Sequence, residues 1–132
     1  MKILYLEPYY SGSHKQWINS YKKFSKNKIK ILGLKGSKWK WRMHGGAITL
    51  ASKFLLLNEV FDLVICSDML NLPVFKSLCI KKLNKSKIVT YFHENQLSYP
   101  WSPHDPDISK KRDLHYAFIN YSTSLVADHN FF

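Results

Sequence analysis

The stretch KILYLEPYYSGSHKQW, residues 2–17, passes from an apolar run into a glycine turn and then into a polar, helix-like segment. Short apolar, β-branched runs recur at residues 28–34, 62–66 and 87–92, and each interval between runs leaves room for a helix. Runs that are apolar throughout are typical of parallel strands covered on both faces. The pattern therefore predicts an α/β protein with a Rossmann-like open parallel sheet and helices on both faces.

Four helices are expected between and after these strands. The first should span residues 13–25, because Ser13 and Gln16 have the spacing of a capping box. The others are expected over residues 47–58, over residues 72–83 with Asn71 as cap and Pro73 in the first turn, and after an Asp107 cap, where a helical stripe is formed by Leu114, Phe118, Tyr121 and Leu125. The final DHNFF reads as the start of another strand, so residues 1–132 are expected to be a single domain that is incomplete at its C-terminal end.

The composition is that of one cytoplasmic domain. The chain has 132 residues, of which 45% are hydrophobic, enough for a single core. Cys66 and Cys79 lack CxxC spacing, so they are expected to be reduced thiols in the core. The sequence has no apolar run of about 18 residues and no signal-peptide pattern, so we expect no membrane partner.

Basic charge is concentrated in the first third of the chain. Residues 1–50 hold eleven basic residues against one acid, Glu7, and so supply +10 of the formal net charge of +11. Such a one-sided field attracts phosphate chains and favours a polyanionic partner. Because 18 of the 20 basic residues are lysine, a lysine-rich genome would give the same excess without any binding role.

Ligands of open α/β sheets bind beyond the carboxyl ends of the strands, where the strand order reverses. The segments of interest are expected after the first, second and fourth strands. After the first strand, Gly12 permits a tight turn, and the helix that follows offers unpaired N–H groups to an anion. An ordinary capped turn would also fit. The candidates for contact with a phosphate or a sugar are Gly12, Ser13, His14 and Lys15.

The segment after the second strand, KGSKWKWRMHGG at residues 35–46, interleaves tryptophan with cations. Stacking of a base on an aromatic ring contributes roughly 1–3 kcal/mol and acts together with phosphate contacts. The segment is thus a candidate site for single-stranded or loop RNA, with core tryptophans as the alternative. Its candidate residues are Lys38, Trp39, Lys40, Trp41 and Arg42.

Four polar side chains follow the fourth strand: His93, Glu94, Asn95 and Gln96. Histidine titrates near neutrality, so His93 and Glu94 could perform acid–base catalysis or hold sugar hydroxyls. The structural alternative is that His93 only ties down the next loop. No metal site is expected, because the spacing of the other candidate ligands matches no known pattern; these are His104, Asp105, Asp107 and His115.

Four motifs occur in order over essentially the whole chain: EPYYSGSHKQW, KWKWRMHGGA, YFHENQLSYP and DLHYAFINYSTSLVAD. Together they resemble the tRNA-queuosine α-mannosyltransferases, a family of glycosyltransferase-like proteins with GT-B architecture. One departure is Ser11, which stands where the family's GGSH loop has its first glycine. The backbone path of that loop is therefore open, although Gly12 is kept.

The resemblance implies a retaining transfer of mannose from GDP-mannose to the cyclopentenediol of queuosine in a tRNA anticodon loop, without a metal or other cofactor. It covers only the N-terminal, acceptor-side half of a GT-B enzyme, so the donor domain is absent and this chain alone is expected not to catalyse transfer. By the family pattern, Gly12, Ser13 and His14 border the donor phosphates, and His93 with Glu94 lines the reacting sugar. Further substrate-binding candidates are Lys15, Asn95, Gln96 and Tyr99.

Two other functions stay open at the level of sequence. The first is a free-standing basic RNA-binding module without catalysis, favoured by the charge of the first third and by the Trp/Lys segment. The second is a flavodoxin-like nucleotide-binding domain or hydrolase, favoured only by the alternating pattern and the histidine and aspartate residues. The second would carry a metal or a flavin when purified. Neither accounts for the four motifs together.

Overall fold

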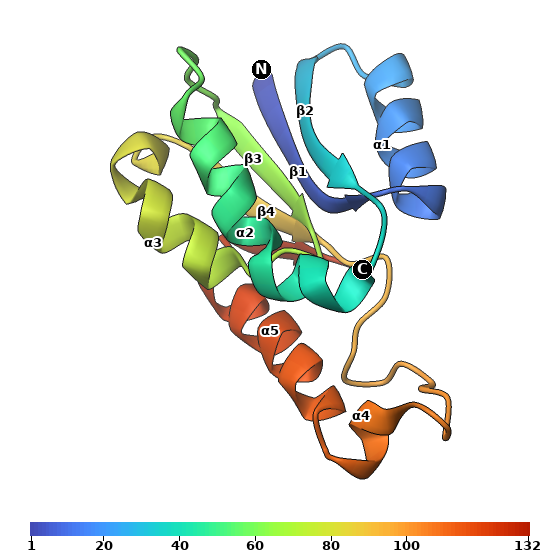
Figure 1. Cartoon of the computed structure of the whole chain (residues 1–132). Coiled ribbons are helices and arrows are strands. Elements are labelled where there is room, and N and C mark those ends of the chain that lie inside the picture. The colour runs from blue at the N-terminus through green and yellow to red at the C-terminus, as the bar shows by residue number, and fades with distance from the viewer.

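The sheet has five strands in the order β2-β1-β3-β4-β5, and every neighbouring pair is parallel (Figure 1). The computed structural model describes residues 1–132. The strands are β1 (Lys2–Tyr10), β2 (Lys28–Lys35), β3 (Leu63–Ser67), β4 (Lys87–Tyr91) and β5 (His129–Phe131). The predicted Rossmann-like open parallel sheet is confirmed.

The helices lie on both faces of this sheet (Figure 1). They are α1 (Gly12–Phe24), α2 (Trp39–Leu55), α3 (Leu72–Leu83), α4 (Pro106–Ser109) and α5 (Asp113–Val126). The chain steps from β1 to β2 in one direction and then crosses back over β1 to β3, so α1 packs on the face opposite to α2 and α3. The strand order therefore reverses between β1 and β3, and this is where ligands of such sheets bind.

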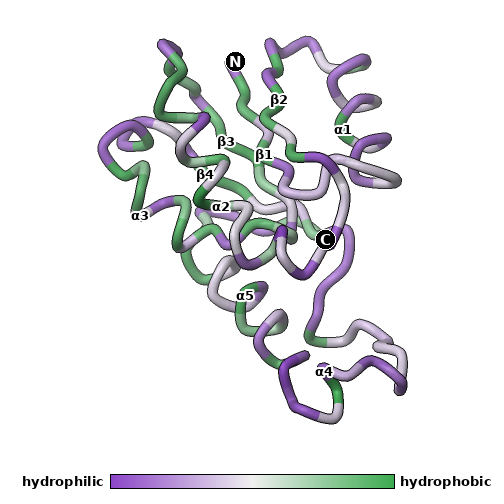
Figure 2. Tube along the Cα trace, in the orientation of Figure 1, coloured by the Kyte–Doolittle hydropathy of each residue, from purple (hydrophilic) through white to green (hydrophobic).

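Two apolar layers hold the sheet between the helices. The larger is a cluster of 16 buried residues that joins β1, β3 and β4 to α2 and α3, and it includes Leu50, Phe54 and Phe75. The smaller packs Ile3 and Tyr5 of β1 against Ile18 of α1. Figure 2 shows the inner strands as mainly hydrophobic segments, while the helices alternate between hydrophobic and hydrophilic stretches.

Local signals located α3 correctly but misplaced the cap of α1. The predicted Asn71 cap is confirmed, since its side chain accepts a hydrogen bond from the Val74 N–H, and a proline lies in the first turn. In α1, however, the N-cap is Ser11 and no side chain caps the helix, so the capping box of Ser13 and Gln16 is wrong. Gly12 has a φ of 51°, which confirms its predicted turn and places the helix start one residue earlier.

Helix α2 begins at Trp39, well before the expected start near residue 47. The adjacent glycines Gly45 and Gly46 both lie inside the helix. A side chain at Gly46 would place its Cβ 2.8 Å from the Cβ of Pro8, so glycine lets α2 approach β1 closely. Consequently most of the segment of residues 35–46, in which tryptophan alternates with cations, is helical, and its side chains point in different directions.

The predicted long fourth helix is two helices, and its apolar stripe faces outward. Asp105 caps the short α4, so the assignment of Asp107 as the cap of the long helix is wrong. On α5 the stripe is exposed, and the buried face includes Asn120 and Thr123. These two side chains bond the backbone after β3: Thr123 Oγ1 accepts from the Leu72 N–H at 3.1 Å and Asn120 Nδ2 donates to the Asp68 carbonyl at 2.8 Å. The exposed stripe comprises Leu114, Phe118, Tyr121 and Leu125.

Both cysteines, Cys66 and Cys79, are free and buried, as predicted. None of the helices combines the length and the apolar character that crossing a bilayer requires.

Two phenylalanine truncations test which apolar residues form the core. Phe75→Ala should lower the free energy of unfolding by about 3–5 kcal/mol, because Phe75 is fully buried. Phe118→Ala should lower it by less than about 1 kcal/mol, because that ring is 63% exposed. Urea unfolding of both variants measures the difference, and equal losses would contradict the outward orientation of the α5 stripe.

Candidate active site

A buried carboxylate lies at the point where the strand order reverses. Glu7 on β1 is fully buried, and four donors surround its two oxygens. Oε1 accepts from Ser67 Oγ of β3 at 2.9 Å and from the Tyr9 N–H at 2.9 Å, while Oε2 accepts from Tyr5 Oη at 3.2 Å and from His14 Nδ1 at 3.0 Å. These bonds offset the loss of hydration that burying a carboxylate entails. Burial and the neighbouring Glu7 raise the pKa of the Tyr5 phenol, so it remains a donor.

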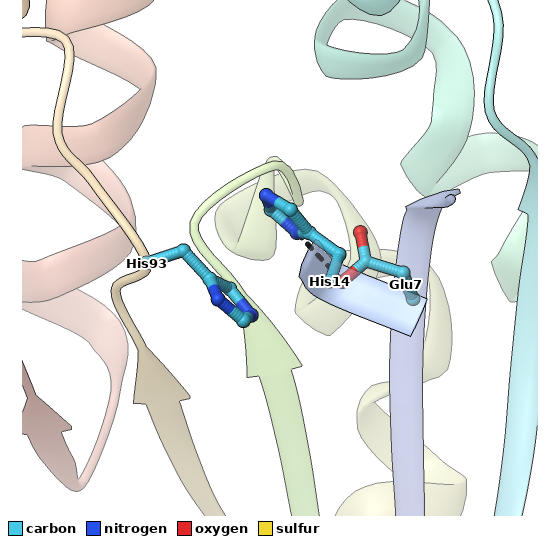
Figure 3. A group of neighbouring side chains, drawn as sticks. All are labelled: Glu7, His14 and His93. Atoms are coloured by element: carbon cyan, nitrogen blue, oxygen red, sulfur yellow. Dashed lines mark hydrogen bonds and ion pairs between the residues drawn. The ribbon is translucent and has the colours of Figure 1, made fainter. Parts of the chain in front are cut away.

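Glu7 fixes both the orientation and the charge of His14 (Figure 3). A carboxylate can only accept, so His14 Nδ1 carries the proton and Nε2 is the nitrogen left for a ligand. Burial alone would lower the pKa of His14, but the hydrogen bond to Glu7 and the charge of Glu7 outweigh it and raise the pKa above its usual value. His14 at the start of α1 is therefore suited to face a negatively charged group.

His93, which follows β4, stacks on His14 with ring centroids 4.0 Å apart. The rings of Trp17 and Tyr91 meet it edge-on, with centroids at 5.7 Å and 4.9 Å. Burial, together with the charge of His14, lowers the pKa of His93 to about 4. The stack thus pairs His14, whose protonated form is favoured, with His93, which is neutral near pH 7. A neutral imidazole can accept a hydrogen bond.

The exit of β3 adds a second buried carboxylate, Asp68. Its Oδ1 accepts from the His93 N–H at 3.0 Å, and its Oδ2 is buried without a partner. Burial raises the pKa of Asp68 to about 7, against the opposing influence of His14. On its other side Asn120 of α5 bonds both the Asp68 carbonyl and the Gln96 N–H, and so ties the β3 and β4 exits together.

Two hollows border the histidine pair. One, of about 170 Å³, is lined by His14 and by residues of the loop after β4, namely Glu94, Gln96 and Tyr99. The other, of about 720 Å³, is lined by His93 with Ser13 and Gln16 of α1. The structure therefore gathers most of the predicted substrate-binding residues around the stacked histidines.

Three predicted site residues have other surroundings. Gly12 forms the turn itself. Lys15 is exposed, with Nζ 5.5 Å from the centre of the Tyr10 ring. Asn95 accepts hydrogen bonds from the N–H and the hydroxyl of Ser98, both at 3.1 Å, and so stabilises its own loop.

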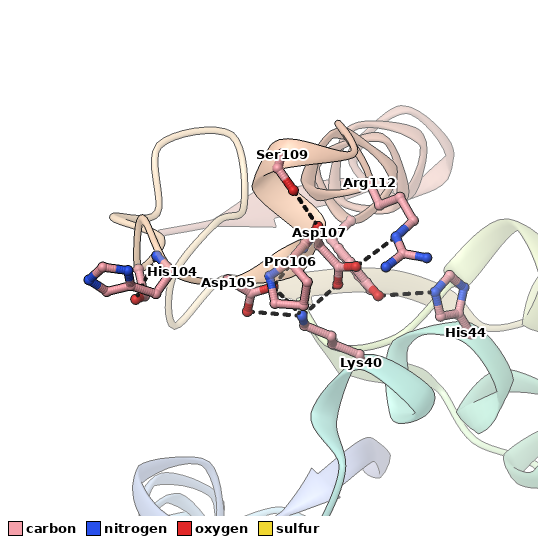
Figure 4. Close-up of polar contacts among 10 residues, drawn as sticks. Lys40, His44, His104, Asp105, Pro106, Asp107, Ser109 and Arg112 are labelled. Atoms are coloured by element: carbon pink, nitrogen blue, oxygen red, sulfur yellow. Dashed lines mark hydrogen bonds and ion pairs between the residues drawn. The ribbon is translucent and has the colours of Figure 1, made fainter.

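Helix formation separates the five predicted RNA-binding residues. Trp39 packs against Trp101 and Tyr116 at 5.4 Å and 5.2 Å, so the core alternative applies to it. Lys40 pairs with two aspartates (Figure 4), and Arg42 Nε donates to the Lys35 carbonyl at 3.0 Å. Lys38 and Trp41 remain exposed.

The group of Glu7, His14 and His93 is less suited to binding a metal than to orienting the His14 ring by hydrogen bonding. Glu7, His14 and His93 each offer a ligand atom, and these atoms lie within 4.8 Å of one another. However, four donors already occupy the two Glu7 oxygens, so a metal bound to Glu7 would have to displace some of these hydrogen bonds. The network therefore favours hydrogen-bond orientation of His14.

Comparison with known proteins identifies the family. Residues 2–132 match the tRNA-queuosine alpha-mannosyltransferase N-terminal family. The chain belongs to this family. A curated tRNA-queuosine alpha-mannosyltransferase of Drosophila melanogaster is 35% identical over 127 residues, which cover 96% of this chain and 32% of the fly protein. The chain thus spans about a third of the length of this relative.

Sequence reasoning missed two carboxylates of this site. Glu7 and Asp68 directly follow the runs ILYL and VICS, and this was the signal that could have found them; Asp68 lies at the exit of β3 and Glu7 within β1. The exit of β3 was not expected to matter, because the interest lay after the first, second and fourth strands. The structure corrects this, since β3 lies beside β1 and the order reverses between them.

Substituting Asp68→Asn should change how stability depends on pH. The folded pKa of Asp68, about 7, lies above its ordinary value of 3.8, so its contribution is complete below about pH 4 and is lost as the pH rises through 7. At pH 8 the variant should gain on the order of 2–4 kcal/mol relative to wild type, and at pH 4 little. Urea unfolding at both pH values measures this, and parallel pH curves would contradict it.

Proposed function

We propose that this chain is the acceptor-side domain of a GT-B enzyme that transfers mannose from GDP-mannose to queuosine in tRNA with retention of configuration. The observation that carries the proposal is the family match over residues 2–132. The geometry supports it, because the stacked histidines lie at the ligand-binding edge of the sheet. The donor-binding domain would belong to a longer protein, consistent with the chain's 32% coverage of the fly relative.

The two histidines suit different parts of this reaction. Transfer breaks the bond between C1 of mannose and the phosphate oxygen of GDP, joins C1 to an oxygen of the queuosine diol, and releases the hydroxyl proton. His14, whose pKa is raised, would face the negative diphosphate together with Ser13. His93, with Glu94 beside it, would line the reacting sugar and accept a hydrogen bond from a hydroxyl of the queuosine diol. No metal or other cofactor has a role in this proposal.

The excess of positive charge supports a nucleic-acid partner, which for this protein we expect in the cytoplasm. Residues 1–50 carry +10 of the net +11, which suits attraction to the tRNA backbone. This field would also serve a module that binds RNA without catalysis. The distinguishing property is whether the queuosine diol itself is recognised.

The chain should bind queuosine-containing tRNA more tightly than the same tRNA without queuosine, and the preference should persist as salt increases. His93→Ala should abolish the preference, a change of about tenfold for the loss of one or two hydrogen bonds to the diol. Fluorescence anisotropy titrations over a salt series measure both dissociation constants.

His104→Ala is the matched control, since His104 is an exposed histidine of the loop after β4. Its preference for queuosine should equal that of wild type. Equal binding of both tRNAs by wild type, collapsing with salt, would contradict acceptor recognition and favour the RNA-binding module. A His93→Ala variant with the preference intact would remove the role of His93.

The 132-residue chain alone should not transfer mannose. Without a donor domain, the sugar nucleotide is neither positioned nor shielded from water. Mass spectrometry of nucleosides from queuosine tRNA incubated with GDP-mannose and this chain should detect no mannosyl-queuosine. Formation of more than one mannosyl-queuosine per protein molecule would contradict the proposal that transfer requires a separate donor-binding domain.

A further inference from the structure

A second concave surface lies between the start of α2 and the start of α5, apart from the histidine pair. This groove has a volume of about 1030 Å³, and its lining includes Trp41, His44, Lys111, Arg112, His115 and Phe118. A volume of this size can hold a nucleotide, since ligand pockets span about 300–1000 Å³. None of these side chains contributes to the Glu7, His14 and His93 network.

Aromatic rings form one wall of the groove. Trp41 is 71% exposed, which is unusual for the residue with the largest apolar surface. The His44 ring lies 6.3 Å from it, edge-on, and 4.9 Å from the His115 ring. The His44 side chain is held by a 3.3 Å contact between Nε2 and the Tyr116 hydroxyl. The wall is thus partly fixed, with a free tryptophan face available for stacking.

Cations border the same groove, and its one acidic residue is already neutralised. Asp107 pairs with Lys40 at 2.5 Å and with Arg112 at 2.7 Å (Figure 4). The Arg112 side chain is still 56% exposed, so part of its guanidinium remains available. Lys111 is exposed and takes part in none of the chain's salt bridges. The groove therefore combines a stacking face with unneutralised positive charge.

We infer that this groove binds one nucleotide of single-stranded RNA, with its base stacked on Trp41 and its phosphate beside Lys111 and Arg112. Single-stranded RNA is recognised by this combination of an aromatic platform and cations, which accepts any base. The inference rests on the proposed function, which makes an RNA loop the partner. It adds a contact to a nucleotide other than the one modified, so the groove contributes affinity without distinguishing queuosine.

Titration of fluorescein-labelled single-stranded oligouridylate into the chain tests the stacking contact. Trp41→Ala should raise the dissociation constant about tenfold, as expected for the loss of one stacked base. Trp41→Phe keeps a ring and should stay within about threefold of wild type. Phe24→Ala removes a 79% exposed ring from α1 and should leave binding unchanged. Circular dichroism verifies that each variant is folded.

The charge contact has its own readout. Lys111→Gln should reduce the slope of log K against log salt by roughly 0.7, the value for one phosphate of a single strand. Lys53→Gln near the far end of α2 is the control and should leave the slope unchanged. RNA should also quench tryptophan fluorescence in wild type, and Trp41→Phe should remove most of that quenching.

The outcomes separate this inference from the proposed function. With queuosine tRNA and the unmodified tRNA, Trp41→Ala should weaken both by the same factor and leave the preference for queuosine intact. If wild type recognises queuosine but Trp41→Ala binds oligouridylate as tightly as wild type, the groove inference alone is overturned. If wild type binds no RNA at low salt, both are overturned.

Discussion

The buried carboxylate of Glu7 is the constraint on which the ligand-binding edge depends. A carboxylate without access to water is tolerated only when donors replace its hydration. Here the donors come from three elements: Tyr5 and Tyr9 of β1, His14 of α1, and Ser67 of β3. Their arrangement fixes the first turn of α1 against the sheet, selects the protonated nitrogen of His14, and positions the ring on which His93 stacks.

A second polar network gives α5 its unusual orientation. Asn120 and Thr123 bond the backbone that leaves β3, and Asn120 also holds the loop after β4. Because these polar side chains face inward, much of the apolar surface of α5 faces outward. The inward face of the helix thus serves the ligand-binding edge, and its packing against Met43 and Met69 is confined to a small cluster.

The parts of the fold with local signals were predictable from sequence. The Asn71 cap and the nearby Pro73 predicted the start of α3, and the apolar runs predicted the first four strands. The start of α2 was missed, and Gly46 lies inside that helix because only glycine fits its close contact with Pro8 of β1, which a local pattern does not show. His14 and His93 were found because they follow strands. Glu7 and Asp68 were not, since only the tertiary order of the strands brings them beside the histidines.

The link between Glu7 and Ser67 joins residues that are 60 positions apart in sequence, and this separation bears on the order of folding. The β1–α1–β2 unit is local, so it can form early at small entropic cost. The carboxylate of Glu7 lacks its β3 donor until that strand docks, and so the edge that binds ligands matures later than the unit that carries His14. During synthesis, a nascent chain would expose an incomplete site until β3 has left the ribosome.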